Sequence, residues 1–135
     1  MNEKQFEYVK KDLQEFLVIN DKNFIAKNLE MVSFYQKYLD IYLHELQEYK
    51  GISIDLDVLK AEKHFFYKFK YDYKLSSLSE IETFIKGDSE IVTLNRRISE
   101  QENYLKFLEK ALQSIKDIGY VARNMLEYKR IEMGD

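Results

Sequence analysis

The sequence predicts an all-α protein made of long antiparallel helices, and three observations support this class. The 135-residue chain has no proline and only four glycines, so it contains few residues that interrupt a helix. Leu, Glu, Lys, Ile and Tyr dominate its composition, as is typical of long helices. Its C-terminal third repeats apolar residues every seven positions. We expect one helical domain over residues 1–135, with helices at about 3–19, 22–50, 55–70, 77–86 and 89–131.

The first two helices are predicted from the spacing of apolar residues. The first carries these at helical intervals: Phe6, Val9, Leu13, Phe16 and Leu17. Asn20 and Asp21 interrupt that pattern, and either can cap the next helix. Residues 22–50 then show a heptad repeat with one position occupied by Ile25, Val32, Leu39 and Leu46 and its partner by Tyr35, Tyr42 and Tyr49. Gly51 is expected to end this helix.

Two short segments leave the secondary structure open. Residues 52–58 alternate apolar and polar side chains, which fits a short strand or the start of the next helix. We favour the helix, with Ser53 or Asp55 as its cap. Residues 67–75 also alternate strictly. The sequence does not decide between strand and helix there.

The last two helices have clear start signals. Ser77 with Glu80 forms a capping box, Gly87 ends the short helix, and Ser89 starts the final one. At about 1.5 Å per residue, a helix over 89–131 is roughly 65 Å long, so another long helix must cover its apolar stripe. A helix of the same chain is the default partner, but the length and the small residues Gly119 and Ala122 favour self-association. The expected oligomerisation residues are Leu105, Leu108, Leu112, Ile115, Gly119, Ala122, Met125 and Leu126.

Several functional classes lack support in this sequence. There is no cysteine, the only histidines are His44 and His64, and no HExxH, CxxC or glycine-rich phosphate loop occurs. We therefore predict no enzyme activity, no catalytic residue, no metal site and no cofactor. We also expect no signal peptide and no membrane-spanning segment, because the sequence contains neither an apolar h-region near Met1 nor an apolar run of about 18 residues.

The most informative segment for function is the stretch from Lys60 to Lys74, KAEKHFFYKFKYDYK. It contains six aromatic residues and five lysines, and with Glu62 and Asp72 it carries a net charge of +3. The whole chain has a net charge of -3, so the remainder carries -6. Lysines interleaved with aromatic rings suit single-stranded nucleic acid, which offers phosphates and stackable bases.

This segment has three interpretations. In the first, the rings belong to the core and the lysines reach out from its edge, and we expect this for Phe65, Phe66 and Phe69. In the second, lysines contact phosphates while tyrosines stack on bases. A membrane surface is the third, but the segment lacks a wide aliphatic face. The candidate DNA-binding residues are Lys60, Lys63, His64, Tyr67, Lys68, Lys70, Tyr71, Tyr73, Lys74, Arg96 and Arg97.

Beyond these patterns, the chain resembles the UvsY family of recombination mediators from T-even-type phages. The resemblance runs from about residue 12 to the end and covers length, segment order and pattern. It is carried by FYQKYL (34–39), VLKAEKHFFY (58–67), SEIETFIKGDSEIVTL (79–94) and ALQSIKDIGYVARNMLEYKRIEMGD (111–135). The C-terminal stretch is the most specific part.

The resemblance implies a non-enzymatic protein that forms a closed ring, hexameric to heptameric, largely through its C-terminal helix. It also implies binding to single-stranded DNA, to the phage single-stranded-DNA-binding protein and to a RecA-like phage recombinase, in the cytoplasm of the infected bacterial host. A Lys-Ala-Arg element of the family matches Lys60, Ala61 and Glu62. Glu62 departs from it, and Lys63 or His64 can supply the missing charge. The main rival is a structural or chaperone-like helical oligomer that binds only protein partners.

Overall fold

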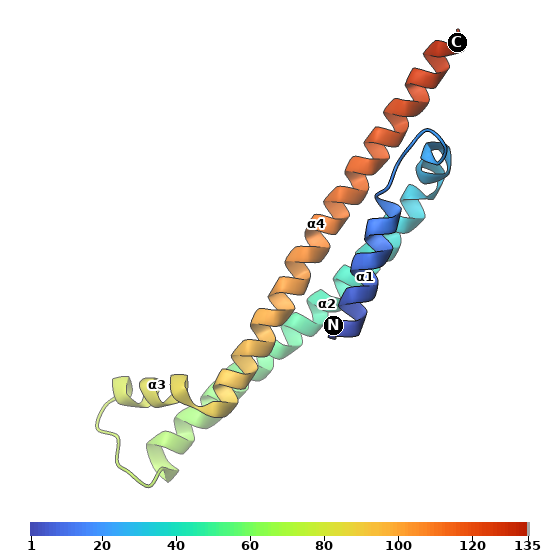
Figure 1. Cartoon of the computed structure of the whole chain (residues 1–135). Helices are drawn as coiled ribbons and strands as arrows, with labels where there is room; N and C mark the ends of the chain where they lie inside the picture. The colour runs from blue at the N-terminus through green and yellow to red at the C-terminus, as the bar shows by residue number, and fades with distance from the viewer. Residues whose placement is uncertain (135) are drawn as a thin grey trace. The chain divides into compact units, whose positions relative to one another are not determined.

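The computed structural model describes residues 1–134 and confirms the all-α class (Figure 1). The elements are α1 (Glu3–Phe16), α2 (Phe24–Phe65), the π-helical turn η1 (Phe66–Lys70), α3 (Leu78–Gly87) and α4 (Ser89–Glu132). No strand occurs among these described residues, so the alternating pattern over 67–75 does not form one.

The chain divides into two compact units, each containing part of α2 and part of α4. Unit 1 comprises Met1–Glu45 together with the chain from Tyr104 onward, and unit 2 comprises Leu46–Asn103. The single domain expected from the chain length stays a prediction.

The predicted helix break at Gly51 is wrong. α2 runs without interruption for 42 residues through this glycine, and Ser53 bonds back to the carbonyl of Tyr49 at 2.9 Å instead of capping a new helix. A glycine inside a helix costs only about 1 kcal/mol relative to alanine. Burying Ile52 and Leu56, which both follow Gly51, contributes more than this, at about 1.5–3 kcal/mol per side chain, so the helix continues.

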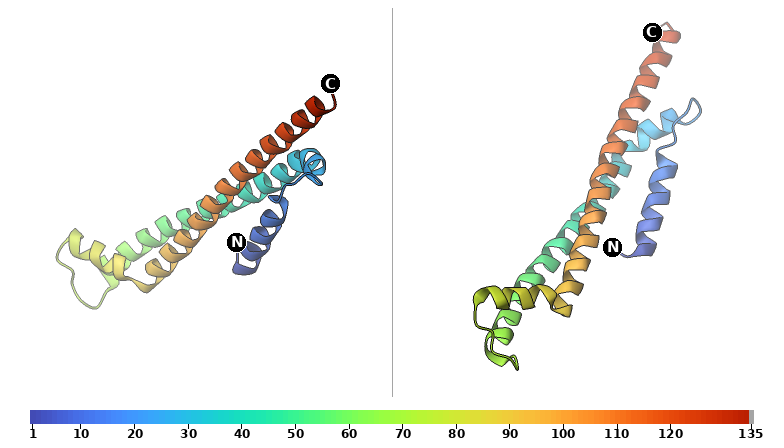
Figure 2. Two further views of the ribbon diagram at one scale, coloured as in Figure 1. Left: turned by 45° about the horizontal axis from the view of Figure 1, so that its top comes forward. Right: turned by 60° about the vertical axis from the view of Figure 1, so that its left-hand side comes forward.

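Unit 1 packs α1 against the first part of α2 and the later part of α4 (Figure 2). Asn2 and Gln5 form a reciprocal capping box at the start of α1. The hydroxyl of Tyr38, fully buried, donates to the Val9 carbonyl at 3.0 Å and to Asp12 at 3.1 Å. Burial and the Asp12 charge raise the pKa of Tyr38 well above its usual range. The core consists of Val9, Leu13, Phe16, Tyr38, Leu108, Ala111 and Ile115.

Most of the predicted heptad positions of α4 that lie in unit 1 are buried. Leu108, Ile115 and Ala122 are fully buried within unit 1, and Leu105 is 8% exposed. A Cβ added at Gly119 would lie 2.7 Å from Cε of Met31 on α2. These five residues are therefore buried within unit 1, and their part in an interface with another copy stays a prediction. Leu112, Met125 and Leu126 are half-buried.

Unit 2 packs α3 and η1 against the later part of α2 and the start of α4. In Figure 1, α3 runs across the direction of the adjoining parts of α2 and α4 in unit 2. The core of unit 2 consists of Leu56, Tyr67, Ile81, Ile85 and Ile91. Ser77 caps α3 as predicted by accepting from the Glu80 amide at 3.2 Å. The Glu80 carboxylate does not complete the predicted capping box. It accepts a hydrogen bond from the backbone amide of Ser76 at 2.9 Å instead.

Candidate nucleic-acid interface

The end of α2 and the turn η1 expose three phenylalanines that the sequence predicted to be core. Phe65, Phe66 and Phe69 are 52%, 39% and 65% exposed, so this prediction is wrong. The core of unit 2 is filled by aliphatic residues from α2, α3 and α4 and by the ring of Tyr67. The phenylalanines are left facing solvent, where large apolar side chains are informative about binding.

Two of these rings form a pair flanked by lysines. The centroids of Phe65 and Phe69, one helical turn apart, lie 5.0 Å from each other. The Lys70 ammonium lies 5.3 Å from the Phe65 centroid, and the Lys68 ammonium lies 5.2 Å from that of Phe69. These are cation–π distances, so each ring is accompanied by a positive charge. We call the exposed set the basic–aromatic surface: Lys60, Phe65, Lys68, Phe69, Lys70, Tyr73 and Lys74.

Tyr67 faces the opposite way and is not placed to stack on a base. It is only 9% exposed, and its ring packs on Tyr71 and Phe84 with centroid distances of 5.1 and 5.8 Å. Its hydroxyl donates to Oδ2 of Asp88 at 2.6 Å. That hydrogen bond, with burial and the Asp88 charge, raises the pKa of Tyr67 to about 12.

Lys63 shares the same carboxylate. Its ammonium lies 3.3 Å from Oδ2 of Asp88 and 3.5 Å from Glu90, with the side chain 17% exposed. Burial alone would lower the pKa of Lys63, but the two carboxylates raise it above its ordinary value. Burial would likewise raise the pKa of Asp88, yet Tyr67, the Glu90 amide and Lys63 hold it below its ordinary value. The charge of Lys63 is thus already paired inside unit 2.

The other predicted residues divide between surface and interior. Tyr71 and His64 are half-buried, and His64 lines a cavity of about 200 Å³ with Lys68 and Leu75. Arg97 lies beside Leu59 and Glu90 in another cavity. All eleven candidates belong to unit 2. The exposed ones are Lys60, Lys68, Lys70, Tyr73, Lys74, Arg96 and Arg97.

A comparison with protein families identifies the class. Residues 12–135 match the family described as the recombination, repair and ssDNA binding protein UvsY. The chain belongs to the UvsY family. The match covers nearly the whole chain, including both units, and confirms the resemblance on which the sequence analysis relied.

Solved structures of UvsY share this fold. Crystal structures of the bacteriophage T4 recombination mediator protein UvsY are similar at TM-scores of 0.80 in lattice type IV and 0.81 in lattice type II. The first is 18% identical and the match covers 93% of this chain and 97% of that one. The second is 19% identical and covers 98% of each chain. Identity at this level supports similarity of the fold alone. A comparison with curated protein sequences finds no match.

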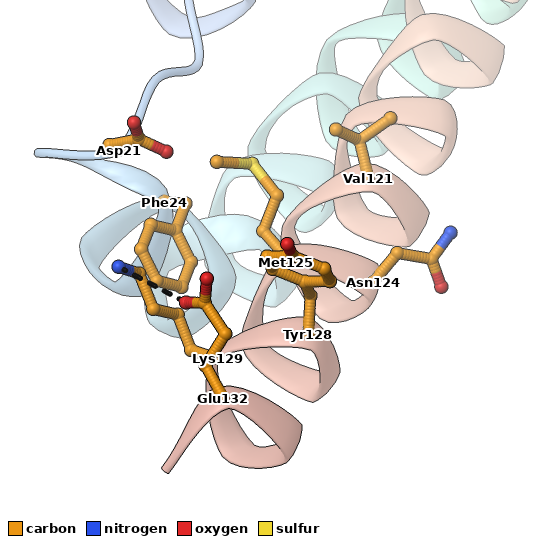
Figure 3. A pocket seen from close by; sticks show the side chains of 8 residues that line it. All are labelled: Asp21, Phe24, Val121, Asn124, Met125, Tyr128, Lys129 and Glu132. Carbon is orange, nitrogen blue, oxygen red and sulfur yellow. Dashed lines mark ion pairs between the residues drawn. The ribbon is translucent and has the colours of Figure 1, made fainter.

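In this UvsY-family chain, unit 1 carries a second exposed apolar region, around a cavity of about 410 Å³ (Figure 3). Val121, Met125 and Tyr128 reach it from α4, while Phe24 lines it from the start of α2. Val121 and Tyr128 are 42% and 63% exposed. The apolar residues left open nearby in sequence are Ile25, Leu29, Val32, Ile131 and Met133.

Within residues 1–134, no group of His, Cys, Asp or Glu is arranged to hold a metal ion. Within the same residues, no helix is both long and apolar enough to cross a membrane.

Proposed function

We propose that this protein binds single-stranded DNA through the basic–aromatic surface. The observation that carries the proposal is the exposed pair Phe65 and Phe69, each accompanied by a lysine ammonium about 5 Å from its ring. Membership of a family of recombination, repair and single-stranded-DNA-binding proteins supports the same ligand.

The chemistry favours a single strand over a duplex. Unpaired bases present their flat faces to aromatic rings, and stacking contributes about 1–3 kcal/mol per base. A duplex hides these faces and offers mainly phosphates. The lysines Lys68, Lys70 and Lys74 can each neutralise one phosphate, so affinity falls with rising salt. Stacking on phenylalanine tolerates any base, so we expect little sequence preference.

Binding of an oligonucleotide across a range of salt concentrations tests the proposal. A plot of log K against log salt concentration has a negative slope, and each phosphate contact on a single strand contributes roughly 0.7 to its steepness. The variant Lys68→Ala/Lys70→Ala/Lys74→Ala should therefore make the slope shallower by about 2. The matched control replaces three exposed lysines of unit 1: Lys11, Lys106 and Lys110. It changes the net charge equally and should leave the slope nearly unchanged.

Two results would count against the site. If the two triple variants lose affinity equally, only net charge matters and the surface is not specific. If the wild type binds no oligonucleotide at low salt, the alternative of an oligomer that binds only protein partners is preferred.

We further propose the mediator role that the sequence analysis expected. The protein would help a RecA-like recombinase to load onto DNA strands covered by single-stranded-DNA-binding protein. A single surface with a few lysines binds weakly, whereas several copies in a closed homo-oligomeric ring bind one strand with much greater avidity. Such a ring could hold a strand in a shape that the resident protein binds poorly and the recombinase binds well.

Self-association is proposed to use the apolar residues that unit 1 leaves exposed. Ile25 and Leu29 on α2 are 56% and 77% exposed, and Ile131 on α4 is 70% exposed. We propose that these exposed residues form part of the interface. Exposed apolar area of this kind commonly marks protein interfaces.

A further inference from the structure

The last turns of α2 contain an unusual change of helix type. From Phe66 to Lys70 the backbone forms a π-helical turn, and Phe65 before it makes no side-chain capping hydrogen bond. π-helical turns are rare, and where they occur they often accompany a functional site. They widen the helix and change the directions of the side chains that follow. Something outside the turn must therefore stabilise it.

The stabilising contacts come from one carboxylate on the other side of the unit 2 core. Oδ2 of Asp88 accepts the Tyr67 hydroxyl at 2.6 Å and lies 3.3 Å from the Lys63 ammonium. Oδ1 of Asp88 accepts the Glu90 amide at 3.0 Å, in the manner of a helix N-cap. Oδ1 of Asp88 thus caps the start of α4. Oδ2 binds the side chains of Lys63 and Tyr67 at the end of α2 and in η1.

These contacts determine which face of the turn is exposed. Lys63 and Tyr67 lie one turn apart and both face Asp88, so this side of the helix end points inward. Phe65 and Phe69, also one turn apart, face solvent. Rotating the end of α2 would break the Tyr67 hydrogen bond before it could bury the phenylalanines. The contacts of Lys63 and Tyr67 with Asp88 therefore keep Phe65 and Phe69 exposed to solvent.

We propose that Asp88, acting through Tyr67, is a positioning residue for the single-stranded-DNA surface. It touches no DNA itself. It holds the π-helical turn so that Phe65 and Phe69 are presented together with Lys68 and Lys70. This inference rests on the function proposed above and assigns to that surface a residue on a different helix end.

The sign of a charge change separates positioning from simple electrostatics. Asp88→Asn removes one negative charge close to the DNA surface and takes from Lys63 one of its two carboxylate partners, leaving Glu90. On charge alone, both changes strengthen binding to a polyanion. Asparagine keeps one oxygen to cap α4 but has no second oxygen for Tyr67 and Lys63. A positioning role therefore predicts weaker binding, despite the more favourable charge.

The experiment measures oligonucleotide affinity at several salt concentrations for folded Asp88→Asn and Tyr67→Phe variants. We expect each to lose about tenfold in affinity, the loss of roughly one stacked base, with an unchanged salt slope. The control Glu90→Gln removes a negative charge at the same place but leaves Asp88 intact. Its affinity should equal or exceed that of the wild type.

Tyr67→Phe keeps the ring and the net charge, so it protects the test against a misfolded Asp88 variant. The thermal unfolding curve of each variant shows the temperatures at which it is folded. Oligonucleotide affinity is then measured at a temperature where every variant is folded. Wild-type or higher affinity for both variants would overturn the inference. If instead Phe65→Ala and Phe69→Ala also bind normally, the proposed surface itself is wrong, and that failure is distinct from failure of the positioning role.

Discussion

The two units of the molecule treat similar side chains in opposite ways. In unit 1, Leu108 and Ile115 recur at heptad spacing on α4 and are fully buried. In unit 2, Phe65 and Phe69 are at least as apolar, yet they are 52% and 65% exposed. The first pair lies within the long helix α4, while Phe65 is the last residue of α2 and Phe69 lies in the π-helical turn η1. The difference is that the first pair faces α1 and α2 within its unit, while the second lies where α2 comes to its end.

This contrast shows that apolar character alone does not decide burial in a helical protein. A repeat sustained along a helix is buried because a second helix can follow it for its full length. A cluster at a helix end is covered only if a neighbouring element reaches it. In unit 2 that element, α3, covers Tyr67 and leaves the phenylalanines open.

The largest effect is expected from the core of unit 1. Ile115→Ala removes a fully buried side chain and should lower the free energy of unfolding by about 2–5 kcal/mol, because it leaves a cavity. Urea unfolding followed by circular dichroism measures this. Ile131→Ala on the exposed part of the same helix should change that free energy by no more than about 0.5 kcal/mol. Equal losses would mean that the two residues are not in different environments.

Self-association should depend more on the exposed Ile131 than on the buried Ile115. Ile131→Asp places a charge on an exposed apolar side chain, and we expect it to weaken self-association at least about tenfold because burying an unpaired charge is costly. Light scattering over a range of concentrations gives the mass. Lys110→Gln, also exposed on α4, makes the same change in net charge and should retain the wild-type mass. A wild type that stays monomeric at micromolar concentration would contradict the proposed interface.

A smaller effect is expected from alkaline pH in unit 2. Because the folded pKa of Tyr67 is raised from 10.0 to about 12, its stabilising contribution is complete below pH 10 and is lost as the pH rises towards about 12. The raised pKa of Lys63 acts with the same sign above 10.5. Asp88, whose pKa is held below its ordinary value, also faces this cluster, and Glu90 lies 3.5 Å from the Lys63 ammonium.

Urea unfolding of wild type and Tyr67→Phe across this pH range isolates the tyrosine. The variant should be less stable at neutral pH, and the difference should shrink as the wild type loses its hydrogen bond. Tyr38 in unit 1 titrates in both proteins and so cancels in the comparison. A difference that stays constant with pH would show that the Tyr67 hydroxyl does not stabilise unit 2.

The smallest effect concerns glycine. At Gly51 an added Cβ would meet nothing within 4 Å, so Gly51→Ala should stabilise α2 by about 0.5–1 kcal/mol. Gly119→Ala would have to displace the Met31 side chain, and its gain should be smaller. Thermal denaturation compares them. A destabilised Gly51→Ala variant would indicate that α2 is not continuous in solution.

Much of the fold could be predicted because it depends on periodicity and caps. The all-α class, the caps of α3 and the start of α4 follow from residues close together in sequence. The continuity of α2 could not be predicted in the same way. Gly51 is a frequent helix stop, and only the burial of Ile52 and Leu56 against distant segments outweighs that local preference.

The candidate site stays a prediction, but the structure reverses the burial expected of its aromatic residues. Lysines next to rings pointed to residues 60–74. Phe65, Phe66 and Phe69 were expected in the core, and the tyrosines were expected at the DNA surface. The structure buries Tyr67 because Asp88 satisfies its hydroxyl, and a partner 21 residues away on another helix end is not visible in local sequence. No sequence signal distinguished Phe65 and Phe69 as exposed.

The exposed rings of the basic–aromatic surface also affect how the free protein behaves in solution. Phe65 and Phe69 could adhere to the same rings of other copies, and the ammonium groups of Lys68 and Lys70 beside them keep such copies apart by like-charge repulsion. Salt screens that repulsion. We therefore expect concentrated, nucleic-acid-free preparations to become turbid as ionic strength rises, and short oligonucleotides to clear them by occupying the rings.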